Sequence, residues 1–376
     1  MDKINLFFWQ NCVSPHQIPY IKELCKDERV EEVFLIVPRT DYEMRKNMGW
    51  NAESLLKDTA IKYYLTPNEE TANGLLKKST EKSFHFFSGI RADADVYHWF
   101  LLSLSYQIKR GIITEAPFTY NRPLWMHYVR FYLQDKKYID QINYIYAIGE
   151  NAVDYYSRLS QKWKVIPFIY CTDKVNPVQE KVHADEVDEE VAKFVYIGSL
   201  SKRKNVISLL RAVALLSDKS SFKLDIIGGG KERAHLETFV AKLHLSTIVN
   251  FRGILPMETV NESLNQYDIV VLPSKYDGWG AVINEALNHG RFAICSDECG
   301  AKILLKNERL GKVFKTDSPK DLARVISECI LNVDIIRKDV PYRKNWSKNI
   351  EGKNIATYFT DNICNIKQTI NLWSRE

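Results

Sequence analysis

The most informative part of the chain is residues 268–286, which read DIVVLPSKYDGWGAVINEA. The apolar run at its start predicts a buried strand, and the residues after Gly280 predict a helix. The glycines on either side of Trp279 let the backbone approach a ligand closely. Free backbone N–H groups at the start of a helix favour an anion such as phosphate. Because Asp277 precedes this helix and Glu285 lies about two turns into it, the two carboxylates can address different parts of one elongated ligand.

Strand-like and helix-like segments alternate along the whole chain, which predicts an α/β protein with two doubly wound, Rossmann-like domains. The strands of the first series are expected at 4–9, 33–37, 84–89, 111–114 and 144–149. Those of the second are expected at 193–198, 224–228, 249–251, 269–273 and 292–295.

The alternation breaks between residues 165 and 190, where two prolines and an acidic stretch predict a linker. We therefore expect an N-terminal domain over 1–170, a linker over 171–190 and a C-terminal domain over 191–345. A final helix over 346–376 is expected to return to the N-terminal domain. Two such domains in tandem are expected to face a cleft in which strand C-termini collect ligands.

The composition excludes several classes of protein. The chain has 376 residues, a net charge of +5 and no strongly basic half, which disfavours a nucleic-acid binder. Seven cysteines occur without a C-x-x-C pair, so a zinc site or a disulfide scaffold is not expected. No apolar run reaches the roughly 18 residues of a membrane span. These features predict a cytoplasmic protein.

The spacing of Asp277, Trp279, Gly280 and Glu285 resembles the acidic–Gly–aromatic–Gly–x4–Glu signature of the retaining family-four GT-B glycosyltransferases (glycosyl transferases group 1). The likeness extends to members that act on bacterial cell-surface polysaccharides. In that family the first carboxylate contacts hydroxyls of the donor sugar, and the second accepts hydrogen bonds from the ribose. This chain has Asp277 where Glu is usual, which bears on the identity of the donor sugar.

Three further segments resemble the same family in the same order. Residues 198–205 are similar to the loop whose Arg and Lys bind the diphosphate: Lys204 falls on the Lys, Ser199 replaces the Arg, and Arg203 is a substitute from the same loop. Residues 228–230 resemble a Gly-rich loop, and 251–253 resemble a loop whose backbone contacts the base. The implied donor-binding residues are Gly198, Ser199, Gly228, Gly229, Gly230, Arg252, Gly253, Ile254, Gly278, Trp279, Gly280 and Glu285.

The resemblance is thinner over the first domain. Asn11, Ser14 and His16 follow the first predicted strand, and Glu115 follows another, so these residues are acceptor-side candidates. A turn with an exposed His16 is the alternative. Residues 93–95 match the Asp-x-Asp motif of metal-dependent glycosyltransferases of the other fold, but they lie in the wrong domain for the donor, so we expect no metal site there.

Together these residues predict a retaining hexosyltransferase that moves a sugar from a nucleotide diphosphate donor, UDP rather than GDP, to a glycan or lipid-linked saccharide. The catalytic candidates are Asp277, Lys204, Arg203 and His16. No cofactor, metal or nucleic acid is expected. The alternatives are a GT-B nucleotide-sugar epimerase or hydrolase, and a non-catalytic nucleotide-sugar-binding protein.

Residues 99–138 mix aromatic and basic side chains. Such a surface suits peripheral contact with the inner face of a membrane. A buried aromatic helix with cations that reach to solvent explains the same composition. Both interpretations stay open at this point.

Overall fold

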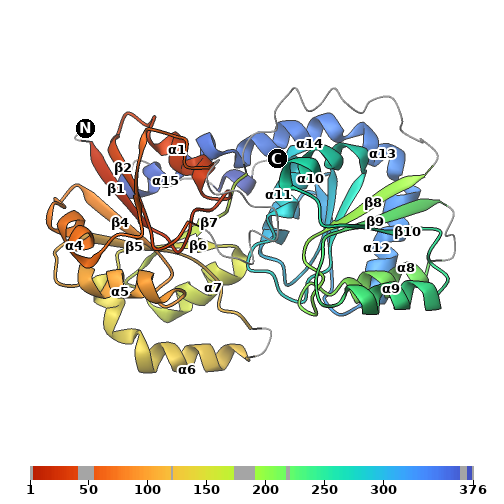
Figure 1. Cartoon of the computed structure of the whole chain (residues 1–376), viewed down its shortest axis with the longest axis horizontal. Helices are drawn as coiled ribbons and strands as arrows, with labels where there is room; N and C mark the ends of the chain where they lie inside the picture. Colours follow the sequence, from red (N-terminus) through yellow and green to blue (C-terminus); the bar gives the residue numbers. More distant parts are fainter. Residues whose placement is uncertain are drawn as a thin grey trace. The chain divides into compact units, whose positions relative to one another are not determined.

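The computed structural model describes residues 3–40, 55–119, 122–172, 191–216, 221–364 and 371–374, and the chain divides into two units (Figure 1). The first unit holds the described residues up to 172 together with those from Ile350 to Leu372. The second holds the described residues between 191 and 349, together with residues 373 and 374. From residue 173 on, the predicted linker lies outside the described residues. Each unit has a parallel sheet and a core of its own.

The first unit contains a seven-stranded sheet in the order β3-β2-β1-β4-β5-β6-β7, with every described pair parallel. All five strands predicted for this sheet are present. The strands are β1 (Ile4–Trp9), β2 (Val30–Val37), β3 (Ile61–Leu65), β4 (Ser83–Ser88), β5 (Lys109–Glu115), β6 (Tyr144–Ile148) and β7 (Lys164–Phe168).

Strand β7 corrects the expectation that the sheet pattern ends at residue 165. Pro167 lies within this strand and pairs in register with Ala147 of β6. A proline cannot donate a backbone hydrogen bond, and it is tolerated here because β7 is the edge strand. The Pro167 carbonyl accepts a hydrogen bond from Tyr358 Oη at 2.9 Å.

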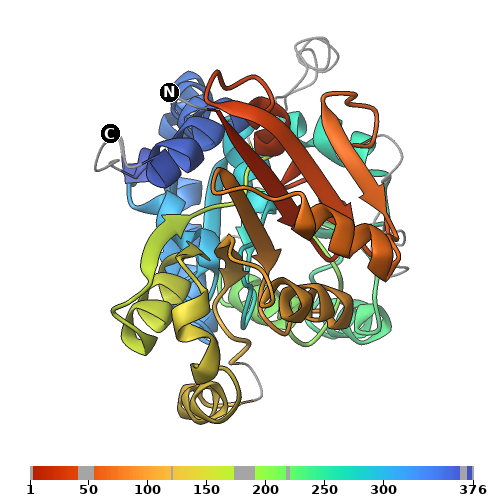
Figure 2. The ribbon, with the colours of Figure 1, turned by 90° about the vertical axis from the view of Figure 1, so that its left-hand side faces the viewer.

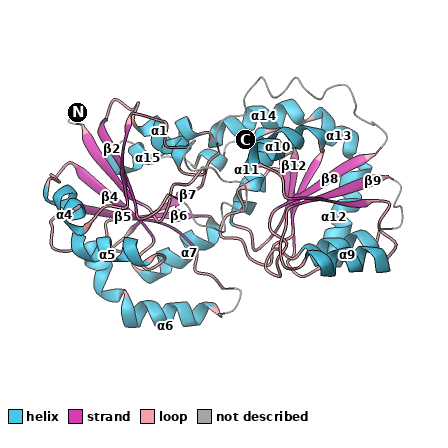
Figure 3. Cartoon of the chain, viewed as in Figure 1, coloured by secondary structure: helices cyan, strands magenta, loops and turns pink. Residues whose placement is uncertain are grey.

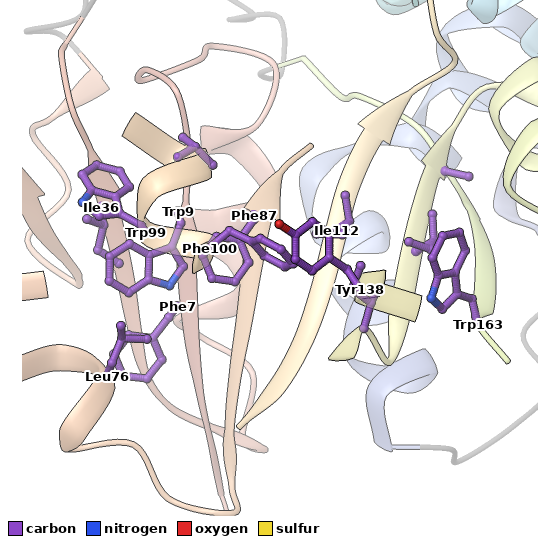
Figure 4. Packing of buried hydrophobic residues seen from close by; sticks show 14 of the residues in the cluster. Phe7, Trp9, Ile36, Leu76, Phe87, Trp99, Phe100, Ile112, Tyr138 and Trp163 are labelled. Atoms are coloured by element: carbon purple, nitrogen blue, oxygen red, sulfur yellow. The ribbon is translucent and has the colours of Figure 1, made fainter. Parts of the chain in front are cut away.

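One face of the first sheet carries the aromatic core drawn in Figure 4. Phe7 and Trp9 of β1 and Phe87 of β4 point to this face, where they meet Trp99 and Phe100. The covering helices are α4 (Glu69–Lys77), α5 (Ala94–Ser103) and α7 (Glu150–Leu159), with α6 (Leu124–Gln134) and the short 3-10 helix η1 (Lys136–Gln141) packed beside them.

The opposite face is covered by α1 (Ile18–Leu24) and the C-terminal helix α15 (Gly352–Cys364). Phe359 of α15 is fully buried, and five aromatic rings have centroids within 6.0 Å of its own. Four of these rings come from strands and one from α1: Phe8, Phe86, Tyr146, Phe168 and Tyr20. Residues from the far end of the sequence therefore complete the core of the first unit.

The second unit contains a six-stranded parallel sheet in the order β10-β9-β8-β11-β12-β13, shown as magenta arrows in Figure 3. All five predicted strands are present, and β13 is additional. The strands are β8 (Ala192–Ile197), β9 (Phe222–Ile227), β10 (Val249–Gly253), β11 (Ile269–Leu272), β12 (Phe292–Ser296) and β13 (Gly311–Phe314).

Helices cover both faces of the second sheet (Figure 1). One layer holds α8 (Val206–Ala214), α9 (Arg233–Lys242) and α12 (Pro319–Leu331). The other holds α10 (Met257–Ser263), α11 (Val282–Asn288), α13 (Val333–Lys338) and α14 (Val340–Ser347). Among the described helices, none combines the length and the apolar content needed to cross a bilayer.

The strand order reverses once in each sheet, between β1 and β4 in the first unit and between β8 and β11 in the second. At such a point the two loops that follow the strands lead away in opposite directions. The carboxyl ends of the strands on either side therefore border a crevice, which is where open α/β sheets bind ligands. The two reversals place the candidate sites.

The buried ring of Phe359 gives a first prediction. Phe359→Ala removes the ring at the centre of the aromatic cluster, so we expect a loss of about 3–5 kcal/mol in the free energy of unfolding. Chemical denaturation followed by tryptophan fluorescence measures this loss. Thr357→Ala, an exposed change on the same helix, is the control and should leave the midpoint nearly unchanged. Equal midpoints for the two variants would contradict a core role for α15.

Candidate functional site

Two loops of the second unit touch through their backbones. The loop after β8 begins at Gly198 and the loop after β9 begins at Gly228, with φ angles of +153° and +138°. A Cβ atom on Gly228 would lie 1.9 Å from the Gly198 carbonyl oxygen. The Leu200 amide also donates to the Gly229 carbonyl at 2.8 Å. Glycine is needed here because the backbones approach too closely for a side chain.

The same cluster extends to the end of β10. The Gly228 amide donates to the Gly253 carbonyl at 2.7 Å, and a Cβ on Gly230 would lie 2.3 Å from the Leu200 carbonyl oxygen. The predicted donor-binding glycines 198, 228, 229, 230 and 253 are thus brought together at the carboxyl edge of the sheet. Backbone hydrogen bonds fix the loop conformations before any ligand arrives.

Lys204 and Asp277 form an ion pair across the reversal in strand order. Lys204 Nζ contacts Asp277 Oδ2, and the side chains are 14% and 13% exposed. Ser274 Oγ donates to the same carboxylate oxygen at 3.3 Å. Lys204 comes from the loop after β8 and Asp277 from the loop after β11. Two residues that sequence reasoning proposed separately therefore share one site.

Arg203 adds a second cation to this pair. Its Nη1 atom lies 3.8 Å from Asp277 Oδ1 and donates to the Tyr276 carbonyl at 2.9 Å. The Arg203 side chain is 35% exposed, so most of its surface is covered by the protein and the rest faces solvent. Ser199 contributes its carbonyl oxygen, which accepts from Tyr196 Oη at 2.9 Å. The three charged side chains carry a net charge of +1, which suits an anionic ligand.

The loop over residues 277–280 rests on a neighbouring loop that sequence reasoning missed. The Gly300 amide donates to the Asp277 carbonyl at 3.0 Å, and a Cβ on Gly300 would lie 2.1 Å from the Gly278 carbonyl oxygen. Gly280 has φ +93°, and a Cβ there would lie 2.7 Å from Cys299 Sγ. Residues 298–301 follow β12, so their place after a strand was the available signal.

The indole of Trp279 packs inside the second unit. The side chain is 2% exposed, and Nε1 donates to Asn284 Oδ1 at 2.8 Å. The Trp279 carbonyl accepts from Cys299 Sγ at 2.9 Å and from the Ala301 amide at 2.7 Å. The indole therefore anchors the loop to the start of α11, and its ring is not exposed to a ligand.

Glu285 lies in α11, partly buried and with no cation beside it among the residues that the structure describes. Desolvation by burial raises the pKa of this carboxyl group to about 7. The folded protein therefore carries a carboxyl group that titrates near neutral pH. An ionised form would be favoured by a ligand that donates hydrogen bonds to it.

Arg252 and Ile254 lie near the end of β10. Ile254 is 61% exposed, and its side chain lies beside Gly229, where an added Cβ would come within 2.8 Å. Arg252 Nε is 3.8 Å from Asp225 Oδ2, and Tyr267 Oη donates to that same oxygen at 2.7 Å. An exposed apolar side chain next to the glycine loop offers a flat surface for a ring system.

The first unit contains a hollow of about 520 Å³ at its own reversal in strand order. Asn11 and Ser14 follow β1, Ser88 ends β4, and Glu115 ends β5, and all four line it. The Asn11 amide donates to Ser88 Oγ at 3.1 Å, which joins the first two loops. Three of the four acceptor-side candidates are thus brought together.

His16 is the candidate that the structure places outside the lining of this hollow. Its carbonyl accepts from the Cys171 amide at 3.2 Å, and its ring lies 6.4 Å from the Tyr170 ring, which does line the hollow. The His16 amide donates to Ser14 Oγ at 3.3 Å. These contacts fit a residue that shapes the loop after β1.

Sequence reasoning missed several charged residues that also line the hollow. Arg91 Nε donates to Asp135 Oδ1 at 2.6 Å, and His127 and Arg130 of α6 lie nearby on the lining. Arg91 follows β4, so its position after a strand was a usable signal. Nothing in the sequence links it to Asp135, 44 residues later.

Residues 93–95, which match the Asp-x-Asp motif, lie at the start of helix α5. Asp93 accepts from the amides of Asp95 and Val96 and so caps α5, and both carboxylates also contact Arg39. Within the described ranges, no group of three or more His, Cys, Asp and Glu side chains is arranged to hold a metal ion.

Residues 178–353 match the family model of the glycosyl transferases group 1. This stretch covers the second unit, including the ion pair and the glycine loops. A curated relative, an uncharacterized glycosyltransferase of Methanocaldococcus jannaschii, is 27% identical over 187 residues, which are 50% of this chain and 46% of the relative. The matched stretch thus spans about half the length of that relative.

Solved structures match both units. HepE of Anabaena, solved in complex with UDP, is 12% identical with a TM-score of 0.71, over 96% of this chain and all of that one. The lipopolysaccharide outer core galactosyltransferase WaaB is 15% identical with a TM-score of 0.68, over 97% of this chain and all of that one. The chain therefore has the GT-B fold. The family model and the curated relative support the glycosyl transferases group 1 as the family of the matched stretch.

The contact between the glycine loops gives a second prediction. Gly228→Ala places a Cβ against the Gly198 carbonyl and strains a backbone at φ +138°, so we expect a loss of at least about 2 kcal/mol in the free energy of unfolding. Gly74→Ala is the matched control: an added Cβ there meets nothing within 4 Å, and alanine favours the helix. Calorimetric melting should separate the variants, and a stable Gly228→Ala protein would contradict the close approach.

Proposed function

We propose that this protein is a retaining glycosyltransferase that transfers a hexose from a nucleotide diphosphate donor, UDP rather than GDP, to a hydroxyl group of a glycan or lipid-linked saccharide. The observation that carries the proposal is the Lys204–Asp277 pair, with Arg203 beside it, at the strand reversal of the unit that matches the family. Cations and a carboxylate at one point suit a ligand with a diphosphate next to a sugar.

In this reaction the bond between the anomeric carbon and the diphosphate oxygen breaks as the acceptor oxygen bonds to the same face of that carbon. Lys204 and Arg203 offset the negative charge that grows on the leaving diphosphate. The acceptor proton passes to the departing phosphate oxygen. Asp277 orients the sugar through its hydroxyls. Because two side-chain cations serve the leaving group, we expect turnover without a metal ion.

The nucleoside end of the donor is assigned to the outer residues of the site. Glu285 is partly buried, and no cation lies beside it in the described part of the chain, so ribose hydroxyls would satisfy its carboxylate. Ile254 is exposed beside the glycine loop, where it can pack against a base while backbone groups of Arg252 and Gly253 contact the base edge. The preference for UDP is supported by the similarity to HepE, which was solved with UDP.

The acceptor is assigned to the hollow of the first unit. Its volume of about 520 Å³ is within the range of sites for small molecules. Hydroxyl, amide and carboxylate groups of Asn11, Ser14 and Glu115 offer both donors and acceptors to a sugar. A role in surface polysaccharide assembly is supported by the similarity to WaaB, a lipopolysaccharide outer core galactosyltransferase.

The two alternative functions can be distinguished from a transferase by whether the donor is consumed and whether an acceptor is needed. A nucleotide-sugar epimerase or hydrolase would consume donor without an acceptor, and a binding protein would consume none. The change of Arg to Ser at position 199 favours the binding protein. The guanidinium of Arg203, 3.8 Å from Asp277, favours the enzyme because it restores a cation at the leaving group.

Replacing Lys204 tests the assignment of the leaving-group site. Lys204→Ala should lower turnover by about 10²–10³-fold, because it removes a charge that stabilises the transition state. Nucleotide release from UDP-, GDP- and ADP-sugars, with EDTA and with pooled saccharide acceptors, measures the effect. Lys202→Ala, an exposed change in the same loop, is the control and should retain activity. Full turnover by Lys204→Ala would refute the site.

Replacing Glu285 separates a binding role from a structural one. Burial raises its pKa to about 7 from an ordinary 4.5, so the folded state holds the proton more tightly than the unfolded chain. The free energy of unfolding should therefore fall as pH rises from about 4.5 to 7. Glu285→Gln should remove this fall and raise the melting temperature at pH 8.

The same variant should bind UDP about ten- to a hundredfold more weakly by calorimetric titration, because hydrogen bonds to a charged group are lost. Exposed Glu262→Gln is the control and should change neither the melting temperature nor the affinity. A stabilised Glu285→Gln protein that binds UDP as tightly as the parent would limit Glu285 to a structural role.

A further inference from the structure

Helix α6 turns an apolar face to solvent. It lies at the margin of the first unit, farther from the sheet than α5 and α7, and this separation is visible in both Figure 1 and Figure 2. Trp125 is 64% exposed and Leu133 is 81% exposed. Met126, Val129 and Tyr132 are also exposed. We call these five residues the α6 face.

The helical repeat gathers the α6 face into one stripe. At about 100° per residue, its five members fall in a continuous arc of roughly 120° around the helix axis. The opposite side is held by the unit: Phe131 is buried, and the His127 carbonyl accepts from Tyr155 Oη at 3.2 Å. A surface helix normally exposes polar residues, so the exposed stripe is the reverse of ordinary amphipathicity.

Positive charge surrounds the α6 face. Arg122, Arg130, Lys136 and Lys137 are all exposed, and Lys136 Nζ lies 5.6 Å from the Tyr132 ring centroid. The helix itself contains no acidic residue. The adjoining acid, Asp135, is buried and paired with Arg91. Apolar and aromatic side chains with a cationic rim are the chemistry that an anionic lipid surface complements.

We propose that α6 docks the first unit on the surface of an anionic lipid bilayer. Val129 and Leu133 enter the boundary of the acyl chains, and Trp125 and Tyr132 lie at the level of the head groups, where aromatic rings are favoured. Lys136, Lys137 and Arg122 lie over the lipid phosphates. The stripe is a single convex helix face with a cationic rim, which favours a fluid lipid surface over a second protein.

Docking in this way would serve the transfer reaction, a step that rests on the proposed function. The side of α6 opposite to the α6 face lines the hollow through His127 and Phe131. A saccharide carried on a lipid would then enter the hollow while its lipid stays in the bilayer. The acceptor class is accordingly a membrane-anchored saccharide.

Vesicle sedimentation tests the docking independently of catalysis. The full chain should bind vesicles of phosphatidylglycerol mixed with phosphatidylcholine at least about tenfold more strongly than vesicles of phosphatidylcholine alone. Leu133→Glu should weaken binding to the mixed vesicles at least about tenfold. Leu331→Glu is the matched control, because Leu331 is 83% exposed on α12 in the other unit, and it should bind like the parent.

The charged rim has its own variant. Lys136→Gln with Lys137→Gln should weaken binding to the mixed vesicles by about fivefold per cation and leave the weak binding to phosphatidylcholine unchanged. The melting temperatures of all variants should match that of the parent, since the changed side chains are exposed.

Three results would overturn the docking: no binding of the parent to mixed vesicles, equal losses for Leu133→Glu and Leu331→Glu, or a dimer in light scattering that only Leu133→Glu dissociates. The last result would assign the α6 face to a second copy. Turnover with a water-soluble acceptor should be the same for Leu133→Glu and the parent. If the parent itself showed no turnover with this acceptor, the result would count against the proposed function and would not affect the proposal that α6 docks on lipid.

Discussion

The ion pair between Lys204 and Asp277 is the interaction around which the second unit is organised. Its two partners come from loops on opposite sides of the point where the strand order reverses, so the pair exists only if both loops hold their shape. Both side chains are largely buried. Removal of Asp277 takes away the carboxylate that Lys204 contacts, and removal of Lys204 leaves Asp277 with Arg203, 3.8 Å away, as its cation. A ligand with negative charge and hydroxyl groups can interact with both partners at once: the charge with Lys204 and the hydroxyl groups with Asp277. A pair with a purely structural role would need no such ligand.

The conformation of the surrounding loops lowers the stability of the folded protein. Four glycines at positive φ bring the backbones after β8, β9 and β10 into contact, and glycine loses more conformational entropy on folding than any other residue. Glu285 adds a further cost, because burial desolvates its carboxyl group. Strain and uncompensated burial at one edge of a sheet are typical of a binding site, where the ligand supplies what the free protein lacks.

Much of this architecture could be predicted because ligands collect after the carboxyl ends of parallel strands, and strands are visible as apolar runs. That rule pointed to the loop that contains Asp277 and to three residues of the hollow, whereas the loops that begin at Gly198 and Gly228 were identified by their resemblance to family loops. Strand β3 was not predicted, because only Ile61 of its five residues is buried and its sequence therefore lacks a clear run of apolar residues. Strand β7 escaped because Pro167 looks like a break unless the edge position is known. The contact between Arg91 and Asp135 depends on tertiary packing, which no local spacing encodes, and the site roles themselves stay predictions.

The burial of Phe359 among rings from β1, β4, β6, β7 and α1 also constrains the order of events during synthesis. Domains usually fold one after another as they leave the ribosome, the N-terminal one first. Here the first sheet lacks a central part of its apolar cover until α15 has been made, and the whole of the second unit is translated in between. An apolar sheet face therefore stays exposed to solvent or to a chaperone while some 180 further residues are added. At about 5–20 residues per second, this takes roughly ten to forty seconds. Nascent chains of this protein should accordingly depend on chaperones until α15 docks.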